Sequence, residues 1–472
     1  MALLGSCKRL SLLPNFTNVA RITSCKALST SASYNAKSKK TLAKKDVKNI
    51  VLVEGVRTPF LMSGTDYANL MPHDLAKRAL EGLANRTKLD KDLVDYIVFG
   101  TVIQEVKTSN IAREAALSAG FKQKTPCHTV TMACISSNQA ITSAMGMVAM
   151  GQADVAIAGG IEFMSDVPIR HSRQMRKFML GLGKAKTAGA KLALASKHLS
   201  MKALAPELPA VAEFSTNETM GHSADRLCAA FGITRNEQDE FAMRSHSLAD
   251  KATKEGLLTD RLDYLVPGRN KPVTRDNGIR VSTPQQMGKL KPAFIKPHGT
   301  ITAANASFLT DGASACLIMT EEKAKELGYK PIAYLRDFVY VAQDPKDQLL
   351  LGPAYATPAV LKRAGLQMSD IDVFEYHEAF AGQILSNLKA MDSDFFAQNY
   401  MGRQTKVGTP PMDKLNLWGG SLSLGHPFGA TGVRLVTTAA NRLHKEDGQF
   451  ALVAACAAGG HGHGAVIERY PS

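Results

Sequence analysis

Apolar runs and helix-forming stretches alternate along most of this chain. Residues 95–102, DYIVFGTV, form a β-rich run before a helical stretch, and residues 371–391, IDVFEYHEAFAGQILSNLKAM, pass from a β run directly into a helix. Residues 127–160 predict a strand, a turn, a helix and a strand that ends in Gly-Gly, and residues 416–460 predict the same order with a glycine-rich turn. Strands joined by helices of this length form parallel βαβ units, so the sequence predicts a duplicated α/β fold.

An insertion separates the two predicted halves. Residues 166–290 interrupt the first half, because residues 305–320, NASFLTDGASACLIMT, predict the turn and strand that close it. The N-terminal half is therefore expected at residues 46–165 and 291–325, and the C-terminal half at residues 326–472. In such folds the reactive groups gather where strands give way to helices.

Within the insertion, residues 168–204 predict a basic hairpin of two short helices. One helix carries an apolar face at the spacing i, i+3, i+4, i+7, and its members are Met175, Phe178, Met179 and Leu182. A basic amphipathic pair suits the surface of an anionic membrane. The candidate membrane contacts are Arg173, Arg176, Lys177, Phe178, Met179 and Leu182. A packed hairpin with solvated lysines is the alternative, which the sequence leaves open.

The net charge of +15 is concentrated in two acid-free segments. Residues 1–45 and 167–206 each hold nine Lys or Arg, whereas acidic residues slightly outnumber basic ones in the rest of the chain. This distribution argues against a general nucleic-acid surface, so no nucleic-acid partner is expected. No apolar run reaches the length of roughly 18 residues that a membrane-spanning helix needs.

The N-terminus is typical of a mitochondrial transit peptide, expected at residues 1–38, because it is acid-free, basic and rich in Ser and Thr. A solvated basic tail is the alternative. The seven cysteines are odd in number, widely scattered and never arranged as CxxC. They indicate neither a disulfide framework nor a zinc module, and they fit a reduced compartment such as the mitochondrial matrix.

Four reactive side chains fall at equivalent strand ends of the predicted repeat. Cys134 precedes a helix, whose N-terminus favours an anion and is expected to lower the pKa of the thiol. His426 lies in the matching glycine-rich turn of the second half, where Gly429 is expected to permit close approach of a ligand. His377 and Cys456 each end a strand of that half. We expect the four groups to converge at the seam between the halves.

The stretch CAAGGHGHG, residues 456–464, permits three interpretations. Cys456 could bind zinc together with His461 and His463, but all three lie on one short segment without a fourth ligand nearby. A phosphate-binding loop is disfavoured because no GK[ST] follows. An acid–base thiol remains, and no metal site is predicted.

Several of these segments resemble blocks of the thiolase family. NLWGGSLSLGHPFGATG at residues 416–432 is similar to the long thiolase signature throughout. CAAGGHGHG, HEAFA at residues 377–381 and MACISSNQAI at residues 132–141 resemble the closing cysteine block, the Asn-Glu-Ala-Phe block and the nucleophile block. The similarity extends from about residue 48 to residue 470. It implies five alternating α-β-α-β-α layers with a mostly helical insertion.

The resemblance also implies a reaction, the thiolytic cleavage of 3-ketoacyl-CoA by CoA in fatty-acid β-oxidation. Cys134 would be the nucleophile, His426 its base and Cys456 the second acid–base group. His377 and His426 would stabilise one oxyanion, and the backbone N–H groups of Cys134 and Ala458 the other. CoA and acyl-CoA are then substrates, and no cofactor or metal is required. A short-chain biosynthetic thiolase and a membrane-docking scaffold with a vestigial site are the alternatives.

Three positions depart from the family pattern. His377 stands where most members have Asn, Ser137 where the nucleophile block has Gly, and Ala458 where the closing block has Gly. The HEAFA variant, the acid-free insertion and the N-terminal segment resemble one branch of the family. Its members form a thiolase dimer and bind a hydratase/dehydrogenase α-subunit on the matrix side of the anionic inner mitochondrial membrane. The resemblance to this branch, together with the amphipathic insertion, favours a preference for substrates with long acyl chains.

Overall fold

A computed structural model of the chain describes residues 42–43, 47–209 and 212–471. The predicted transit peptide, residues 1–38, lies outside these residues. In the part that the structure describes, no helix is both long enough and apolar enough to cross a membrane.

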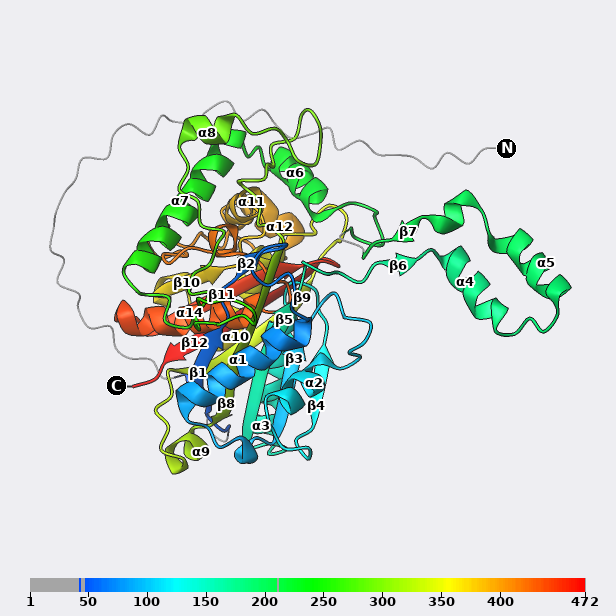
Figure 1. Ribbon diagram of the computed structural model, residues 1–472. Helices are drawn as coiled ribbons and strands as arrows, with labels where there is room; N and C mark the ends of the chain where they lie inside the picture. Colours follow the sequence, from blue (N-terminus) through cyan, green and yellow to red (C-terminus); the bar gives the residue numbers. More distant parts are fainter. Residues whose placement is uncertain (1–41, 44–46, 210–211, 472) are drawn as a thin grey trace. The chain divides into compact units, whose positions relative to one another are not determined.

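The N-terminal half is built on a mixed sheet with strand order β4-β3-β5-β8-β1 (Figure 1). The strands are β1 (Ile50–Arg57), β3 (Tyr96–Gly100), β4 (Cys127–Val130), β5 (Val155–Glu162) and β8 (Thr310–Thr320). β3 runs parallel to β4 and β5, whereas β8 is antiparallel to both β5 and β1. The predicted parallel βαβ unit is confirmed for β3 and β5, and β8 and β1 add antiparallel strands whose direction the sequence pattern does not predict.

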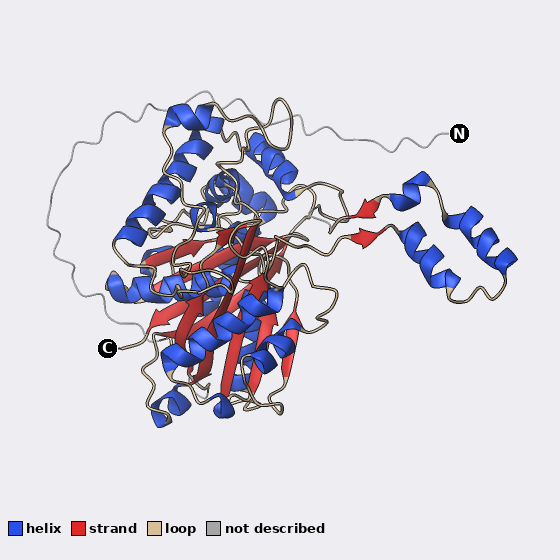
Figure 2. Ribbon diagram, viewed as in Figure 1, coloured by secondary structure: helices blue, strands red, loops and turns tan. Residues whose placement is uncertain are grey.

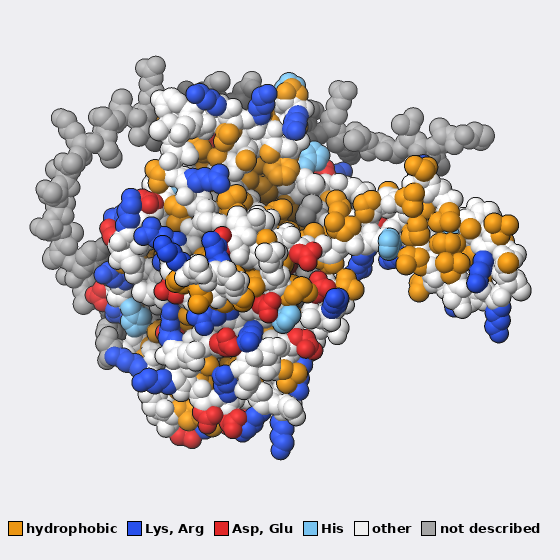
Figure 3. Space-filling model, in the orientation of Figure 1, with side chains coloured by type: hydrophobic (Ala, Val, Ile, Leu, Met, Phe, Trp, Pro, Cys, Tyr) orange, Lys and Arg blue, Asp and Glu red, His pale blue; other side chains and the backbone are white. Residues whose placement is uncertain are grey.

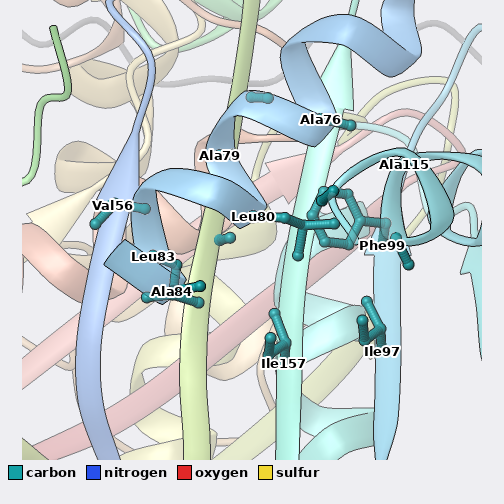
Figure 4. Close-up of a cluster of buried hydrophobic side chains, with 14 of the residues drawn as sticks. Val56, Ala76, Ala79, Leu80, Leu83, Ala84, Ile97, Phe99, Ala115 and Ile157 are labelled. Atoms are coloured by element: carbon teal, nitrogen blue, oxygen red, sulfur yellow. The ribbon is translucent and has the colours of Figure 1, made fainter. Parts of the chain in front are cut away.

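Helices α1 (Pro72–Thr87) and α2 (Ile111–Ser118) cover the outer face of this sheet (Figure 4). Leu80 of α1 lies over Phe99 and Ile157, which belong to neighbouring strands (Figure 4). All three side chains have no exposed surface. This apolar contact holds the outer helices on the sheet.

The C-terminal half continues the same hydrogen-bonded sheet in the order β9-β12-β11-β10. Its strands are β9 (Ala333–Ala342), β10 (Val373–Tyr376), β11 (Phe450–Ala457) and β12 (His461–Arg469). Two residue pairs between β1 and β9, Val51 with Tyr334 and Leu52 with Ala333, join the halves. Helices α10 (Gly352–Ala364) and α11 (Ala381–Met391) bring apolar residues to the outer core of this half.

Two helices form the central layer between the sheet halves: α3 (Ser136–Ala149) and α14 (Thr431–Lys445). They contact each other, and one apolar cluster contains buried residues of both helices and of strands from both halves. The layers therefore alternate α-β-α-β-α, as in the thiolase fold. The predicted strand at the start of residues 416–460 is wrong, because this stretch contains the short helix α13 (Ser421–Leu424) instead.

The insertion is mostly helical and is attached to β1 by a buried ion pair. Its longer helices are α6 (Met220–Ala230) and α7 (Arg235–Lys254), followed by the short α8 (Pro284–Gly288). Arg57 donates to Asp260 at 2.9 Å and to Asp276 at 2.6 Å. The remaining short elements are β2 (Leu61–Met62), η1 (Lys91–Leu93), α9 (Glu321–Glu326), η3 (Met368–Asp370) and α12 (Asp394–Tyr400).

The basic hairpin consists of α4 (Arg173–Leu182) and α5 (Ala188–His198), and Figure 2 shows it extending away from the sheet. Its neck pairs β6 (Arg170–His171) with β7 (Pro206–Glu207), next to η2 (Met201–Leu204). Hydrophobic side chains gather on the visible face of the hairpin (Figure 3). Met179 is 50% exposed, and Leu180 and Leu192 are each 74% exposed.

Two details differ from the predicted membrane face. Phe178 and Leu182 are half-buried rather than exposed beside Met179, because α4 contacts α5. Arg176 forms an ion pair with Glu207 at 2.5 Å, so its charge is partly neutralised at the neck. Arg173 and Lys177 are exposed.

Candidate active site

Cys134 lies in the tight turn between β4 and α3. The preceding residue, Ala133, has φ of +44°, a left-handed conformation that is costly for a residue with a Cβ. Ser136 stabilises the turn, because its hydroxyl accepts the N–H of Met132 at 2.8 Å and donates to the carbonyl of Ala133 at 2.6 Å. The turn therefore places the thiol directly before the helix.

His426 lies in the corresponding turn of the other half, before α14. Thr431 donates its hydroxyl proton to the carbonyl of Pro427 at 3.0 Å, so its oxygen is left to accept a proton from His426 Nδ1 at 2.7 Å. This hydrogen-bond accounting assigns the proton to Nδ1 and leaves a lone pair on Nε2. His426 can therefore act as a base through Nε2.

His377 directly follows β10, and its ring lies beside that of His426 at an interplanar angle of 47°. The ring centroids are 4.1 Å apart, and His377 Nδ1 lies 3.1 Å from the hydroxyl of Ser421. The Nε2 atoms of both imidazoles are buried and have no hydrogen-bond partner within the described residues. Buried polar atoms without partners are costly, so these two nitrogens are available to a ligand.

The structure brings Cys134, His377 and His426 together. One ligand atom of each side chain lies within 4.8 Å of the others. These atoms are of the type and spacing that could hold a metal ion. The same arrangement places an imidazole lone pair beside a thiol, which suits nucleophilic catalysis without a metal.

Cys456 ends β11 and reaches the same site. It is 1% exposed, and burial together with the nearby Cys134 raises the pKa of its thiol. The backbone N–H groups of Ala458 and Cys134 both interact with the sulfur of Cys134. The two predicted backbone donors therefore lie beside this sulfur.

The expectation that the helix N-terminus lowers the pKa of Cys134 is wrong. Burial raises its pKa to about 12, and this effect outweighs the N–H group of Ala458. Burial, assisted by His377 and Arg434, also lowers the pKa of His426 well below its ordinary value. The resting pair is thus a neutral thiol beside a neutral imidazole, so the proton must move as the sulfur attacks.

Gly429 lies at the close contact between the two halves. A Cβ at Gly429 would lie 2.3 Å from the carbonyl oxygen of Ile161, and one at Gly160 would lie 1.7 Å from the oxygen of Gly429. The buried Ser137 adds a hydrogen bond across the seam, accepting the N–H of Val433 at 3.2 Å. These contacts fix the His426 turn on the N-terminal half.

The two histidines of CAAGGHGHG point away from Cys456. Cys456 is paired with Gly462, whereas His461 and His463 are paired with the neighbouring Ala457 and Ala455. Because side chains alternate between the two faces of a sheet, these histidines lie on the face opposite to the thiol. His463 stacks on Tyr340, with ring centroids 4.8 Å apart.

Glu162 is a supporting residue that the sequence reasoning missed. Its carboxylate accepts the N–H groups of Val102, Ile103 and Gly429 at 2.9 to 3.1 Å, so it joins β5 to the His426 turn. Burial raises its pKa to about 8. The available signal was a single acid at the end of the otherwise apolar run VAIAGGIE.

A cavity of about 330 Å³ is lined partly by residues that are sequence neighbours of residues at the site. It is lined in part by Leu422 of α13 and by Ala306 and Phe308, and Leu309 is bridged to His426. Met287 of α8 and Arg280 come from the insertion. A partly apolar pocket with a cation suits an organic molecule that carries phosphate groups.

A thiol beside an imidazole lone pair, with a second thiol and unpaired donors around it, defines an enzyme that transfers acyl groups through a cysteine thioester. Residues 50–322 match the thiolase N-terminal domain, and residues 329–469 match the thiolase C-terminal domain. The chain belongs to the thiolase family and is an acyltransferase.

Comparison with similar proteins supports the assignment to this family. The mouse (Mus musculus) protein named "Trifunctional enzyme subunit beta, mitochondrial" is 71% identical over 444 residues, covering 94% of this chain and 93% of that protein. The human (Homo sapiens) protein of the same name is 68% identical, covering 97% of this chain and 98% of its own length. The crystal structure of human mitochondrial 3-ketoacyl-CoA thiolase aligns with a TM-score of 0.76 at 27% identity, covering 90% of this chain and 99% of that one. These similarities place the chain among mitochondrial thiolases.

Proposed function

We propose that this thiolase cleaves long-chain 3-ketoacyl-CoA with CoA in mitochondrial β-oxidation, giving acetyl-CoA and an acyl-CoA two carbons shorter. The cluster of Cys134, His377 and His426, with Cys456 beside it, carries the proposal. The identity of 71% to a mitochondrial trifunctional enzyme subunit beta supports the placement in β-oxidation.

In the first half-reaction, Cys134 attacks the 3-keto carbon while its proton passes to Nε2 of His426. Because burial raises the pKa of the thiol, its proton is not released beforehand and passes to the unpaired nitrogen as the new bond forms. The bond between C2 and C3 then breaks. The acyl group stays on Cys134, and the acetyl-CoA enolate takes a proton from Cys456 at C2.

In the second half-reaction, the Cys456 thiolate removes the thiol proton of incoming CoA. The CoA sulfur attacks the thioester, and the thioester oxygen accepts hydrogen bonds from the backbone N–H groups of Cys134 and Ala458. Cys134 leaves as a thiolate and regains its proton from His426, so every proton returns to its starting group. This sequence of steps calls for neither a metal ion nor a redox cofactor.

The cavity lined by Leu422, Met287 and Arg280 is the proposed site of the CoA arm of the substrate. Its apolar lining suits the pantetheine chain, and Arg280 suits the phosphates. The thioester oxygen would then lie against the unpaired Nε2 atoms of His377 and His426.

The basic hairpin is the proposed contact with the anionic inner mitochondrial membrane, on its matrix side. Exposed Met179, Leu180 and Leu192 could enter the interface while Arg173 and Lys177 meet lipid phosphates. A surface-bound enzyme would meet long acyl chains where they partition. We further propose a thiolase dimer bound to a hydratase/dehydrogenase α-subunit, a partnership that the name "Trifunctional enzyme subunit beta" supports.

The function is tested by following the loss of 3-ketohexadecanoyl-CoA absorbance on addition of CoA, with acetoacetyl-CoA as the parallel substrate. Rapid loss of the long-chain substrate and little turnover of acetoacetyl-CoA are expected. Turnover of acetoacetyl-CoA alone would assign a short-chain thiolase. If neither reacts even with the α-subunit added, the chain is a docking scaffold and the proposal fails.

A further inference from the structure

A chain of buried polar groups lies behind His377, on the side away from Cys134. Arg434 of α14 donates through Nη2 to the hydroxyl oxygen of Ser421 at 2.7 Å. The same hydroxyl lies 3.1 Å from His377 Nδ1. All three side chains are at most 1% exposed, so bulk water does not reach them.

The direction of these hydrogen bonds can be assigned from what each group can donate. A guanidinium group only donates, so Ser421 must accept from Arg434. The hydroxyl proton of Ser421 then needs an acceptor, and within the described part of the chain the acceptor in reach is His377 Nδ1. A buried hydroxyl proton without an acceptor is costly. His377 therefore carries its own proton on Nε2.

This assignment is opposite to that of the neighbouring ring. Thr431 gives its proton to the carbonyl of Pro427 and accepts from His426, which leaves a lone pair on His426 Nε2. The two adjacent imidazoles therefore offer different groups to a bound substrate. His426 offers a lone pair, and His377 offers an N–H donor. Both Nε2 atoms are buried and unpaired, so neither role is taken by another protein group in the described residues.

Arg434 is also suited to keep His377 neutral. Burial chiefly, and then the Arg434 charge, lower the pKa of His377 to about 3. Glu375 Oε2 lies 3.8 Å from Arg434 Nη1, which is charge attraction without a hydrogen bond, whereas Glu375 Oε1 accepts a hydrogen bond from Arg442 at 2.7 Å. The hydrogen bond that Arg434 gives to Ser421 therefore sets its position at this site.

We propose that Arg434, acting through Ser421, is a positioning residue that holds His377 in the Nε2–H tautomer, so that His377 donates directly to the thioester oxygen of the substrate. The proposal rests on the thiolytic function above and adds to it a division of roles between two adjacent imidazoles. It gives the His in HEAFA the donor that the reaction requires without an intervening water.

The tautomer is tested directly by NMR on wild-type enzyme labelled with ¹⁵N-histidine, with His377→Asn used to assign the resonances. The protonated and unprotonated nitrogens of a neutral imidazole have clearly different ¹⁵N shifts. We expect a protonated Nε2 in His377 and a protonated Nδ1 in His426. A protonated Nδ1 in His377 would overturn the proposal whether or not the enzyme cleaves 3-ketoacyl-CoA.

A double-mutant cycle tests the route through Ser421. Ser421→Ala should lower kcat about tenfold to hundredfold with little change in KM, because the donor is lost mainly in the transition state. In the His377→Asn background the same substitution should change kcat by less than about twofold. An equal loss in both backgrounds would show that Ser421 acts only on structure and would overturn the proposal.

Two further variants complete the test. Ser423→Ala removes an equally buried hydroxyl from the same short helix, where it contacts Ser245 and Gly420 rather than a histidine. We expect it to leave kcat unchanged while lowering stability as much as Ser421→Ala does. Arg434→Lys, which retains a cationic donor, should keep more activity than Arg434→Met, and equal losses in the two would argue against the role of Arg434.

Discussion

The turns before α3 and α14 occupy matching places in the two halves, but they hold their reactive groups in different ways. The Cys134 turn depends on backbone geometry and the Ser136 hydroxyl, and α3 carries no charged residue. The His426 turn depends on Thr431, and α14 carries the buried Arg434 and Arg442. A thiol needs only a defined position, whereas an imidazole also needs a defined proton. The helix that follows the imidazole turn therefore carries buried charges, whereas the helix that follows the thiol turn carries none.

The thiol side of this comparison predicts the largest effect. Cys134→Ala should lower thiolysis by at least about 10⁴-fold, because no other group can carry the acyl chain at that position. Steady-state assays with CoA measure the loss. An unchanged rate would show that the turn before α3 does not supply the nucleophile.

The imidazole side predicts a smaller effect. His426→Asn should reduce kcat by about 10²- to 10⁴-fold, the range for losing a general base. Thr431→Ser keeps the hydroxyl on Nδ1 and should stay near wild type, whereas Thr431→Val should lose activity. Equal activities for the two Thr431 variants would contradict the assigned tautomer of His426.

The contact between β5 and the His426 turn predicts an effect of pH on stability. Glu162 has a pKa raised from 4.5 to about 8, so the folded state keeps a proton that the unfolded chain releases. Its contribution to the free energy of unfolding is therefore full below about pH 4.5 and is lost as the pH rises toward 8. In urea unfolding, the free energy of unfolding of Glu162→Gln should fall less steeply with rising pH than that of the wild type. The difference in slope should be up to about 1.4 kcal/mol per pH unit. Parallel profiles for the two proteins would refute this raised pKa.

The hairpin carries none of the reactive side chains of the two turns. Substitutions in it should therefore change membrane binding without changing catalysis. Met179→Glu with Leu180→Glu, or deletion of residues 170–204, should weaken sedimentation with cardiolipin-containing vesicles severalfold, because apolar insertion is lost. Met412→Glu is the matched control, because the Met412 side chain is apolar, 41% exposed and outside the hairpin. Unchanged sedimentation of the hairpin variants would favour the packed-hairpin alternative.

The sequence predicted the elements around the site better than their directions. The helical stretch after DYIVFGTV is α2, and the run from residue 371 to residue 391 is β10 and α11. The closing strand at residues 305–320 is β8, but its antiparallel direction depends on partners far away in the chain. Cys134, His377 and Cys456 each follow or end a strand, a position that local pattern can show, whereas His426 follows the short helix α13 and is indicated by its glycine-rich turn alone.

The supporting residues could not be found in that way. Arg434 gains its role only when α14 packs beside Ser421 of α13, and Glu162 only when β5 meets the His426 turn; neither has a local motif. The pKa of Cys134 was predicted in the wrong direction because burial depends on the assembled layers, whereas the helix N-terminus is visible in the sequence. Long-range packing thus decided both the charge state and the tautomers.

Trapping the acyl-enzyme tests the central claim most directly. The enzyme is mixed with 3-ketohexadecanoyl-CoA without CoA, quenched in acid and digested, and the cysteine peptides are weighed by mass spectrometry. We expect an acyl group two carbons shorter than the substrate chain on the peptide that contains Cys134, and none in Cys134→Ala. An acyl group on Cys456 instead, or its absence from wild-type enzyme that turns over the substrate, would contradict the assignment of the nucleophile.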